Sequence, residues 1–289
     1  MKALASMILI GMSLFTMSAQ TVEKEINEGI RFCESTYPYN GGILIANFGT
    51  EQLNPLNTEG KGYIVFHKDG KNEVLVGADR NLSAPKGMLV YKEFLYVADV
   101  NKVVAYNLAD RDAKPYIIQL PEGHMFANDM VTDGSYIYLS VTNTDAIFRI
   151  DISQPSTPGS PELWSSVPGP NGLLLHDGSL YVASYPADGN TTEKNVVYRI
   201  SDMKNPSAEK WIDISGQYDG IALSSDGKSL YVTNWTPAQI SRIDFLSRTI
   251  KPIDLKLSDA LVGRADITVE DGYIYIPDLP NSRVVVVKE

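Results

Sequence analysis

The sequence predicts an all-β fold, a six-bladed β-propeller with about four antiparallel strands in each blade. A short apolar strand recurs six times along the chain, and tight-turn dipeptides precede four of its copies. No segment beyond the N-terminal region shows a convincing helical period. Units of about 40–50 residues that each contain several strands are typical of propeller blades.

The recurring strand sets the period of the repeat. Its second residues are separated by 52, 42, 43, 50 and 44 positions. Its copies are Ile43-Leu44-Ile45-Ala46, Leu95-Tyr96-Val97-Ala98, Ile137-Tyr138-Leu139-Ser140, Leu180-Tyr181-Val182-Ala183, Leu230-Tyr231-Val232-Thr233 and Ile274-Tyr275-Ile276-Pro277.

Each unit has further strands on both sides of the recurring one. An inner strand is expected first, and in four units it ends in an Asp-Gly turn, as at Asp133-Gly134 and Asp177-Gly178. A third strand is expected at residues 62–66, 102–106, 146–150, 195–200, 239–244 and 283–287. A fourth, more polar strand closes most units, as at residues 116–118 and 210–212.

The last unit has no sequence left for its outer strand, because its third strand ends at Val287. We expect residues 21–30 to supply that strand. Both ends of the chain would then share one blade, which closes the ring and removes an exposed sheet edge.

The first 19 residues are expected to be a signal peptide, which leaves residues 20–289 as one propeller domain. Lys2 carries the positive charge, Met7 to Phe15 is mostly apolar, and the small residues Ser18 and Ala19 precede the expected cleavage point. This stretch is too short to span a bilayer as a mature anchor, and no later segment is long and apolar enough to do so. We therefore expect a secreted or periplasmic protein with no membrane span in the mature chain.

Composition argues against several classes of function. The chain has 25 basic and 35 acidic residues and a formal net charge of −10, so nucleic acid is not an expected partner. The one cysteine, Cys33, cannot form an internal disulfide and is expected to be a small buried residue. The sequence has no Gly-x-Ser-x-Gly elbow and no phosphate-binding glycine loop, which disfavours serine hydrolases and nucleotide hydrolases.

One position of the repeat is expected to face the central channel, because the inner strands of a propeller surround its axis. Counting back nine residues from the recurring strand, or eleven in the fifth unit with its longer turn, gives this position in every unit. The residues are Glu34, Lys86, Asn128, Asn171, Asp219 and Ala265.

The residues alone leave two explanations of this polar ring open. The carboxylates of Glu34 and Asp219 and the amide oxygens of Asn128 and Asn171 would form an oxygen-only site for Ca²⁺, Mg²⁺ or Mn²⁺. No cysteine or histidine pair points to a dedicated structural zinc site. Alternatively, these side chains cap strand ends and bind channel water.

Four short motifs resemble those of the regucalcin/gluconolactonase family of six-bladed propellers. They are Glu34-Ser35, Phe126-Ala127-Asn128-Asp129, Pro170-Asn171-Gly172-Leu173 and Tyr218-Asp219-Gly220-Ile221, in the order of that family. The resemblance covers essentially all of the chain after the signal peptide. It implies that Glu34, Asn171 and Asp219 hold one divalent cation, and that Asn128 orients the substrate or a metal-bound water.

The same resemblance implies hydrolysis of sugar lactones and related esters. The cation, with Ca²⁺ favoured over Mg²⁺, Mn²⁺ or Zn²⁺, would polarise the carbonyl group, and Asp219 would also act as general base on water. We therefore predict a small-molecule substrate such as a sugar lactone, with Asp219 and Asn128 as catalytic residues.

The chain departs from the family pattern at two places. Thr36 and Tyr37 follow Ser35, where the family usually has a proline. Phe126 stands where the family commonly has an arginine that contacts substrate. The substrate is therefore expected to differ.

Two basic residues, Lys86 and Arg264, are predicted to lie near the channel mouth. They are candidate substrate-binding residues for an anionic group, and the alternative is that they balance the charge of the carboxylates. A non-catalytic propeller that binds a sugar, a peptide or a protein at this mouth is the alternative function. Strictosidine-synthase-like and paraoxonase-like enzymes share the expected architecture.

The other candidates are expected to have supporting roles. Asp129 and Asp266 lie one position past the channel position and are expected to support it. His124 is the best-placed histidine for proton transfer, but a surface position is expected. Tyr185 and Trp235 follow recurring strands and either wall the pocket or pack between blades. Polar residues near the ends of recurring strands are expected to make turn hydrogen bonds, namely Asp99, Asn143, Asn234 and Asp278.

Overall fold

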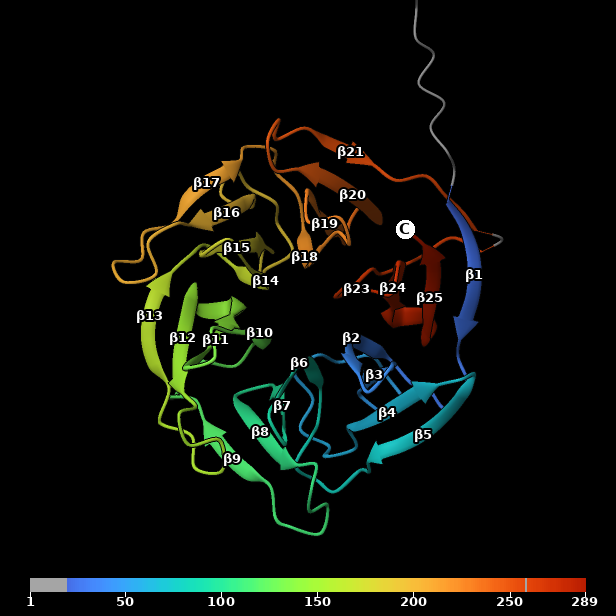
Figure 1. Cartoon of the computed structure of the whole chain (residues 1–289), viewed down its shortest axis with the longest axis vertical. Helices are drawn as coiled ribbons and strands as arrows, with labels where there is room; N and C mark the ends of the chain where they lie inside the picture. Colours follow the sequence, from blue (N-terminus) through green and yellow to red (C-terminus); the bar gives the residue numbers. More distant parts are fainter. Residues whose placement is uncertain (1–19, 258) are drawn as a thin grey trace, which may run out of the picture.

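The computed structural model describes residues 20–257 and 259–289, and the predicted signal peptide lies outside these residues. Six sheets surround a central axis, so the prediction of a six-bladed β-propeller is confirmed (Figure 1). The helices of the described residues are two short 3-10 turns, η1 (Thr142–Thr144) and η2 (Leu279–Asn281). No helix in this part of the chain has the length and apolar character needed to cross a membrane.

The inner strand of each blade lies beside the axis (Figure 1). These strands are β2 (Cys33–Tyr39), β6 (Pro85–Tyr91), β10 (Ala127–Thr132), β14 (Pro170–His176), β18 (Tyr218–Leu223) and β23 (Thr268–Glu270). The recurring apolar strand is the second strand of each blade. These strands are β3 (Gly42–Asn47), β7 (Phe94–Asp99), β11 (Tyr136–Val141), β15 (Ser179–Ser184), β19 (Ser229–Asn234) and β24 (Tyr273–Asp278).

The third strands pair with the second strands and confirm the expected positions within a few residues. They are β4 (Tyr63–Lys68), β8 (Lys102–Asn107), β12 (Ala146–Asp151), β16 (Val197–Ile200), β20 (Gln239–Asp244) and β25 (Arg283–Lys288). Shorter or more polar strands form the outer edges of the first five blades. They are β5 (Lys71–Val76), β9 (Tyr116–Gln119), β13 (Glu162–Ser166), β17 (Glu209–Ile212) and β21 (Ile250–Pro252).

The sixth blade joins the two ends of the chain, as expected. β1 (Gln20–Ile26) pairs antiparallel with β25, and the short β22 (Leu255–Lys256) adds in parallel outside it. The order of this sheet is therefore β22-β1-β25-β24-β23. The N-terminal strand covers the edge that β25 would otherwise expose.

The core of the protein lies between neighbouring blades. In β7, for example, the residues from Leu95 to Ala98 are all fully buried, because both faces of the strand pack against another sheet. Leu89 on β6 and Met130 on β10 share one apolar cluster, although they belong to different blades. This two-sided burial explains why the second strands are continuous apolar runs. The same packing between blades holds the inner strands in place around the axis.

Cys33 is part of this core. It is fully buried, and its thiol donates a hydrogen bond to the backbone oxygen of Arg283 at 3.2 Å. Burial raises the pKa of the thiol, so it stays protonated. The expectation of a small buried residue is confirmed.

Candidate functional site

The six predicted channel positions are equivalent in the structure. In every blade, the residue before the channel position pairs with the last residue of the second strand. These pairs are Cys33–Asn47, Pro85–Asp99, Ala127–Val141, Pro170–Ser184, Tyr218–Asn234 and Arg264–Asp278. The register counted from the sequence, including the longer turn of the fifth unit, is therefore confirmed.

A β-bulge explains how these side chains reach the axis. In each of the first five blades, the register between the inner and second strands shifts just after this pair, as between Pro170 and Leu173 or between Tyr218 and Ile221. The channel residue lies within the shifted segment. Bulges re-aim side chains and occur frequently beside active sites. At each channel residue of these five blades, the bulge therefore interrupts the regular alternation of side-chain direction along the strand.

A glycine follows three of the channel residues, Lys86, Asn171 and Asp219, and at each of these glycines the next blade leaves no room for a β-carbon. A β-carbon at Gly172 would lie 2.5 Å from the backbone oxygen of Asp219, and one at Gly220 would lie 2.5 Å from the Cα of Asp266. Neighbouring inner strands thus approach too closely for any side chain at these positions. The Asn-Gly and Asp-Gly motifs combine a channel side chain with a close contact between blades.

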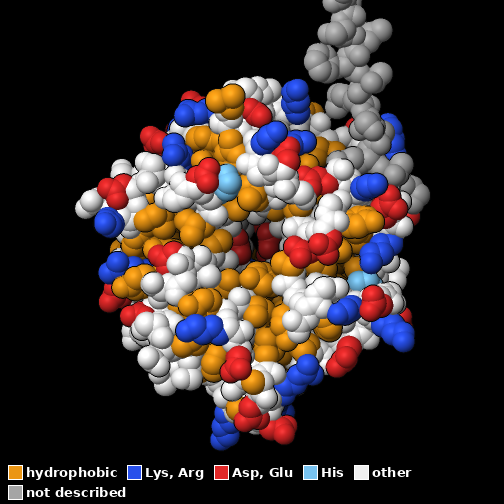
Figure 2. Space-filling view, in the orientation of Figure 1, with side chains coloured by type: hydrophobic (Ala, Val, Ile, Leu, Met, Phe, Trp, Pro, Cys, Tyr) orange, Lys and Arg blue, Asp and Glu red, His pale blue; other side chains and the backbone are white. Residues whose placement is uncertain are grey.

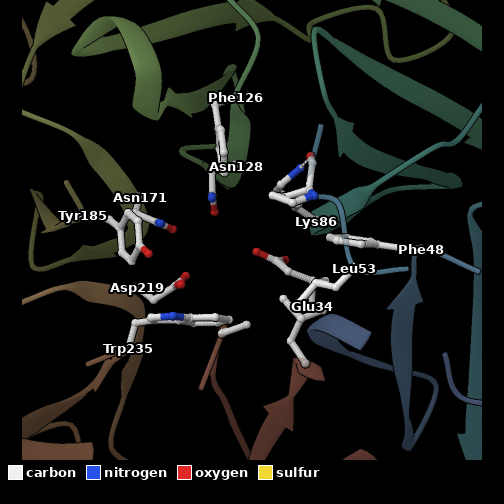
Figure 3. Close-up of a pocket in the computed structure, with 13 residues that line it drawn as sticks. Glu34, Phe48, Leu53, Lys86, Phe126, Asn128, Asn171, Tyr185, Asp219 and Trp235 are labelled. Carbon is white, nitrogen blue, oxygen red and sulfur yellow. Dashed lines mark hydrogen bonds between the residues drawn. The ribbon is translucent and has the colours of Figure 1, made fainter. Parts of the chain in front are cut away.

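The channel residues line one cavity with a volume of about 260 Å³, which we call the central cavity. All six blades contribute to it. Its lining residues are Glu34, Phe48, Leu53, Pro55, Lys86, Phe126, Asn128, Asn171, Tyr185, Asp219, Trp235, Ala265 and Leu279. The side chains of Glu34, Asn128, Asn171 and Asp219 point toward a common centre (Figure 3).

Among the described residues that line this cavity, three fully buried oxygen atoms have no hydrogen-bond partner. They are one carboxylate oxygen of Glu34 (Oε2), one of Asp219 (Oδ1), and the amide oxygen of Asn171 (Oδ1), and each is buried. A buried acceptor without a partner is costly and requires an explanation. These are the three residues predicted to bind a cation, and their donor atoms suit a hard divalent ion.

The carboxylates around this centre repel one another. Burial and the charge of Asp219 raise the pKa of Glu34 well above its ordinary value. Burial, followed by the charge of Asp266, raises the pKa of Asp219 to about 8, and burial raises that of Asp266 to about 6. Burial and the charge of Asp266 likewise raise the pKa of Asp129. Two of these carboxylates, Glu34 and Asp219, line the cavity, and acidic side chains are visible inside the central hole (Figure 2).

Lys86 is the one basic residue among those that line the central cavity in the described chain. Its ammonium group donates hydrogen bonds to the backbone oxygens of Pro55 and Ala84, both at 3.0 Å. It also lies over the rings of Phe126 at 5.1 Å and Phe48 at 5.6 Å. Burial lowers the pKa of Lys86, while the charge of Glu34 opposes this. These contacts favour charge balance over the predicted role in binding substrate.

Arg264 does not line the central cavity. Its side chain is 9% exposed, its Nε and Nη1 atoms have no hydrogen-bond partner, and burial lowers its pKa to about 10. Its backbone forms the strand pair that places Ala265 at the cavity wall. Its predicted contact with substrate stays a prediction.

Asp129 and Asp266 hold neighbouring inner strands together. The Asp129 carboxylate accepts hydrogen bonds from the backbone N–H groups of Met130 and Leu173, both at 2.7 Å. The Asp266 carboxylate accepts one from the hydroxyl of Ser35 at 2.8 Å. Each carboxylate therefore links its own blade to the next, in agreement with the expected supporting role.

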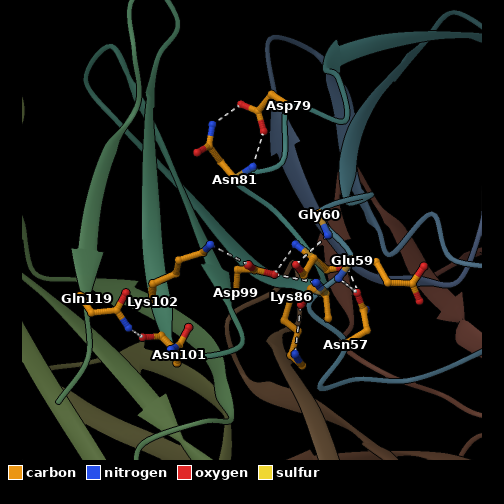
Figure 4. A network of polar contacts seen from close by, with 12 residues as sticks. Asn57, Glu59, Gly60, Asp79, Asn81, Lys86, Asp99, Asn101, Lys102 and Gln119 are labelled. Carbon is orange, nitrogen blue, oxygen red and sulfur yellow. Dashed lines mark hydrogen bonds and ion pairs between the residues drawn. The ribbon is translucent and has the colours of Figure 1, made fainter. Parts of the chain in front are cut away.

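Polar residues near the ends of the second strands fix the loops that lead into the site. Asp99 accepts hydrogen bonds from the backbone N–H groups of Ser83 and Ala84, just before Lys86, and lies 3.6 Å from the ammonium of Lys102 (Figure 4). Equivalent bonds run from Met125 to Asn143, from Gln217 to Asn234, and from Val262 and Gly263 to Asp278. The expectation of turn hydrogen bonds is confirmed for all four residues.

Aromatic and apolar residues form the remaining walls. Tyr185 and Trp235 line the cavity, which was one of the two roles expected for them. They flank Asn171 and Asp219 (Figure 3). Phe48, Leu53, Pro55 and Leu279 were not anticipated. Phe48 and Leu279 follow the second strand directly, as Tyr185 and Trp235 do, so counting from the end of that strand would have found them.

No histidine is among the residues that line the central cavity in the described chain. His124 lies near the surface, where its Nδ1 is 2.7 Å from the hydroxyl of Thr144 and its ring packs against Phe148. Any proton transfer at this centre would therefore involve the carboxylates, Lys86 or Tyr185.

The donor set differs from a histidine- or acid-rich metal centre. In residues 20–257 and 259–289, no group of three or more His, Cys, Asp or Glu side chains is arranged to hold a metal ion. The candidate set instead combines the two carboxylates of Glu34 and Asp219 with amide oxygens. Such mixed oxygen sets are typical of Ca²⁺ sites.

No protein-family model matches the chain, and no curated protein matches its sequence significantly. A structural genomics protein of unknown function from Bacteroides thetaiotaomicron VPI-5482 is 13% identical with a TM-score of 0.66, over 94% of this chain and 74% of that one. A streptogramin B lyase is 16% identical with a TM-score of 0.59, over 92% and 96% of the two chains. A chain of a nidogen/laminin complex is 11% identical with a TM-score of 0.56, over 84% and 83%. At these identities, the similarity shows the propeller fold alone.

Proposed function

We propose that the chain is a divalent-cation-dependent hydrolase of lactones or related esters, similar to the gluconolactonase group, with its site in the central cavity. One observation carries the proposal. In the described chain, the three buried cavity oxygens without hydrogen-bond partners belong to Glu34, Asn171 and Asp219, which lie on three separate blades. A cation bound among them would satisfy all three.

The charge of the site supports a cation. Burial and neighbouring carboxylates raise the pKa values of Glu34, Asp129 and Asp219, and burial raises that of Asp266. The ammonium of Lys86 is bonded to backbone oxygens beside them. A divalent ion would favour the ionised form of each carboxylate and reverse these shifts. The hard oxygen donors suit Ca²⁺, and Mg²⁺ and Mn²⁺ share this preference.

The residues of the chain divide the chemistry between them. A divalent ion bound by Glu34, Asn171 and Asp219 supplies Lewis-acid polarisation of the substrate carbonyl. Asp219 accepts a proton from the water whose oxygen bonds to the carbonyl carbon. The ring C–O bond then breaks, and Asp219 returns the proton to the departing alkoxide oxygen. The amide of Asn128, which points to the same centre, orients the substrate (Figure 3).

Hydrolysis of lactones by the purified chain with added Ca²⁺, Mg²⁺ or Mn²⁺ tests this proposal. We expect Asp219→Ala and Glu34→Ala each to lower kcat/KM at least 100-fold without loss of the circular dichroism of the folded protein. Full activity in both variants would show that the site lies elsewhere.

A binding propeller that uses the same mouth is a second candidate. Exposed apolar side chains near the mouth favour it, because Leu53 is 37% and Met125 is 44% exposed. The fold is shared with a lyase and with a chain of a nidogen/laminin complex, so the fold itself does not decide between the two. Tight binding of a partner with no turnover of any lactone would favour this candidate.

We also propose that the chain is exported, to the periplasm or out of the cell. The basic Lys2, the apolar run from Met7 to Phe15 and the small residues before position 20 support this. Sequencing the N-terminus of the protein recovered outside the cytoplasm should give Gln20. Recovery of an intact Met1 there would contradict it.

A further inference from the structure

The walls of the central cavity are apolar, whereas its polar groups point to one centre. The apolar walls consist of Phe48, Leu53, Phe126, Tyr185, Trp235 and Leu279. The indole of Trp235 lies beside Asp219, and Phe126 lies beside Asn128 (Figure 3). A substrate that places its carbonyl at the polar centre must therefore place the rest of its body against aromatic and aliphatic surface.

Few polar groups remain to bind that body. Glu34, Asn171 and Asp219 are assigned to the cation, and the ammonium of Lys86 already donates to two backbone oxygens. Among the lining residues of the described chain, this leaves the amide of Asn128, the hydroxyl of Tyr185 and three N–H donors, namely the side-chain NH2 of Asn171, the indole N–H of Trp235 and the third N–H of Lys86. Most of these groups are donors, so the hydroxyl protons of a polyhydroxylated ring would lack acceptors, and each buried hydroxyl without a partner costs roughly tenfold in affinity.

The rim of the cavity continues the apolar surface. Leu53 lines the cavity and is 37% exposed. Leu56, Met125 and Val262 are 39%, 44% and 58% exposed, and each is next in sequence to a residue that lines or contacts the wall. For Val262 this neighbour is Gly263, where a β-carbon would lie 2.6 Å from the Trp235 ring.

The size of the cavity fits an apolar group of moderate size. An apolar cavity of about 150 Å³ is enough to hold benzene, and the central cavity has a volume of about 260 Å³. We infer that the substrate is a lactone or ester with an aryl or medium-length alkyl body, and not a polyhydroxylated sugar lactone. This inference rests on the proposed hydrolase function, and it assigns Phe126 and Trp235 as residues that determine specificity.

Two six-membered lactones with the same reactive group test the inference. One carries a pentyl substituent, and the other is the lactone of a hexonic acid. In the presence of Ca²⁺, we expect kcat/KM to be at least tenfold higher for the pentyl lactone. A preference for the hexonic lactone would overturn the inference and leave the hydrolase function intact.

Substitution of Trp235 tests whether the aromatic wall determines the preference for the pentyl lactone. Trp235→Ala is expected to lower kcat/KM for the pentyl lactone at least tenfold and to leave the Ca²⁺-induced rise in Tm unchanged. Leu163→Ala is the control, because Leu163 is 66% exposed on the outer strand β13. Equal losses on both lactones in Trp235→Ala would contradict a role in specificity.

Binding of unreactive analogues separates this inference from the proposed function. Calorimetry with 2-pentyltetrahydropyran and with a 1-deoxyhexopyranose measures recognition of the body without hydrolysis. If no lactone is hydrolysed but the pentyl ether binds at least tenfold more tightly, the hydrolase proposal fails and the apolar specificity stands. If neither ether binds and no lactone is hydrolysed, the hydrolase proposal and the inference of an apolar substrate are both overturned.

Discussion

Gly172 lies so close to Asp219 that a β-carbon on it would be 2.5 Å from the backbone oxygen of Asp219. The two residues belong to neighbouring blades, and both Asn171 and Asp219 point to the centre of the cavity. The distance between these two blades therefore also sets the distance between two candidate cation ligands. A change at Gly172 should affect stability and cation binding together.

Gly172→Ala is expected to destabilise the protein by about 1–3 kcal/mol, because the new methyl group forces the inner strands apart. For a chain of this size, Tm should fall by roughly 3–10 °C, and affinity for Ca²⁺ should fall at least tenfold. Thermal unfolding and calorimetric titration measure these effects. Gly77→Ala is the matched control, because a β-carbon there would meet nothing within 4 Å. Equal behaviour of the two variants would refute the packing argument.

Added cation should stabilise the folded protein, because only the folded state brings Glu34, Asn171 and Asp219 together. At 100 times the dissociation constant, the gain is about 2.7 kcal/mol, which corresponds to a rise in Tm of roughly 5–10 °C. Asp219→Ala should abolish this rise. Asp213→Ala should keep it, because Asp213 is on the surface and pairs with Lys210. A rise that survives in Asp219→Ala would show that the ion binds elsewhere.

The repeat made most of this site accessible from the sequence. A fixed count from the second strand reached Glu34, Asn128, Asn171 and Asp219, because the same strand pair precedes each of them in its blade. Leu53 and Pro55 lie on the connection between β3 and β4, which is longer than the corresponding connection in any other blade. No periodic signal marks such a loop, so its contribution to the cavity requires the tertiary structure.

The hydrogen bonds and ring contacts of Lys86 could not be predicted from the sequence either. The position of Lys86 at the channel mouth predicts either binding of an anionic substrate or balance of the carboxylate charges. The structure surrounds its ammonium group with the backbone oxygens of Pro55 and Ala84 and with two aromatic rings. One of these oxygens belongs to the same irregular loop. The role of a charged side chain thus depends on neighbours that the repeat does not encode.

Without cation, the folded protein should become less stable as pH rises from about 4 to 8. The pKa of Asp219 is raised to about 8 and that of Asp266 to about 6. In this range the unfolded chain has already lost protons that the folded chain retains, so deprotonation favours unfolding. We expect a loss of a few kcal/mol by denaturant unfolding in chelator. Saturating Ca²⁺ should remove most of this dependence, and Asp219→Asn should reduce it in chelator. A rise in stability with pH in chelator would contradict the raised pKa values.

Lys86→Met should strengthen cation binding while it weakens the fold. The substitution removes a buried positive charge that competes with a divalent ion for the carboxylates of Glu34 and Asp219, so Ca²⁺ affinity should rise about tenfold. It also leaves the backbone oxygens of Pro55 and Ala84 without their donor, which costs about 2–4 kcal/mol of stability. Calorimetric titration and denaturant unfolding measure the two effects separately.

The control for this variant is Lys61→Met, because Lys61 pairs with Glu59 on the surface and lies outside the cavity lining. Lys61→Met should leave both the Ca²⁺ affinity and the free energy of unfolding nearly unchanged. The alternative role of Lys86, direct contact with an anionic substrate, gives a different pattern. In that case Lys86→Met would raise KM for lactones that carry a carboxylate and leave KM for neutral lactones unchanged. The charge-balance role instead predicts the same change for both, because it acts through the cation and the carboxylates.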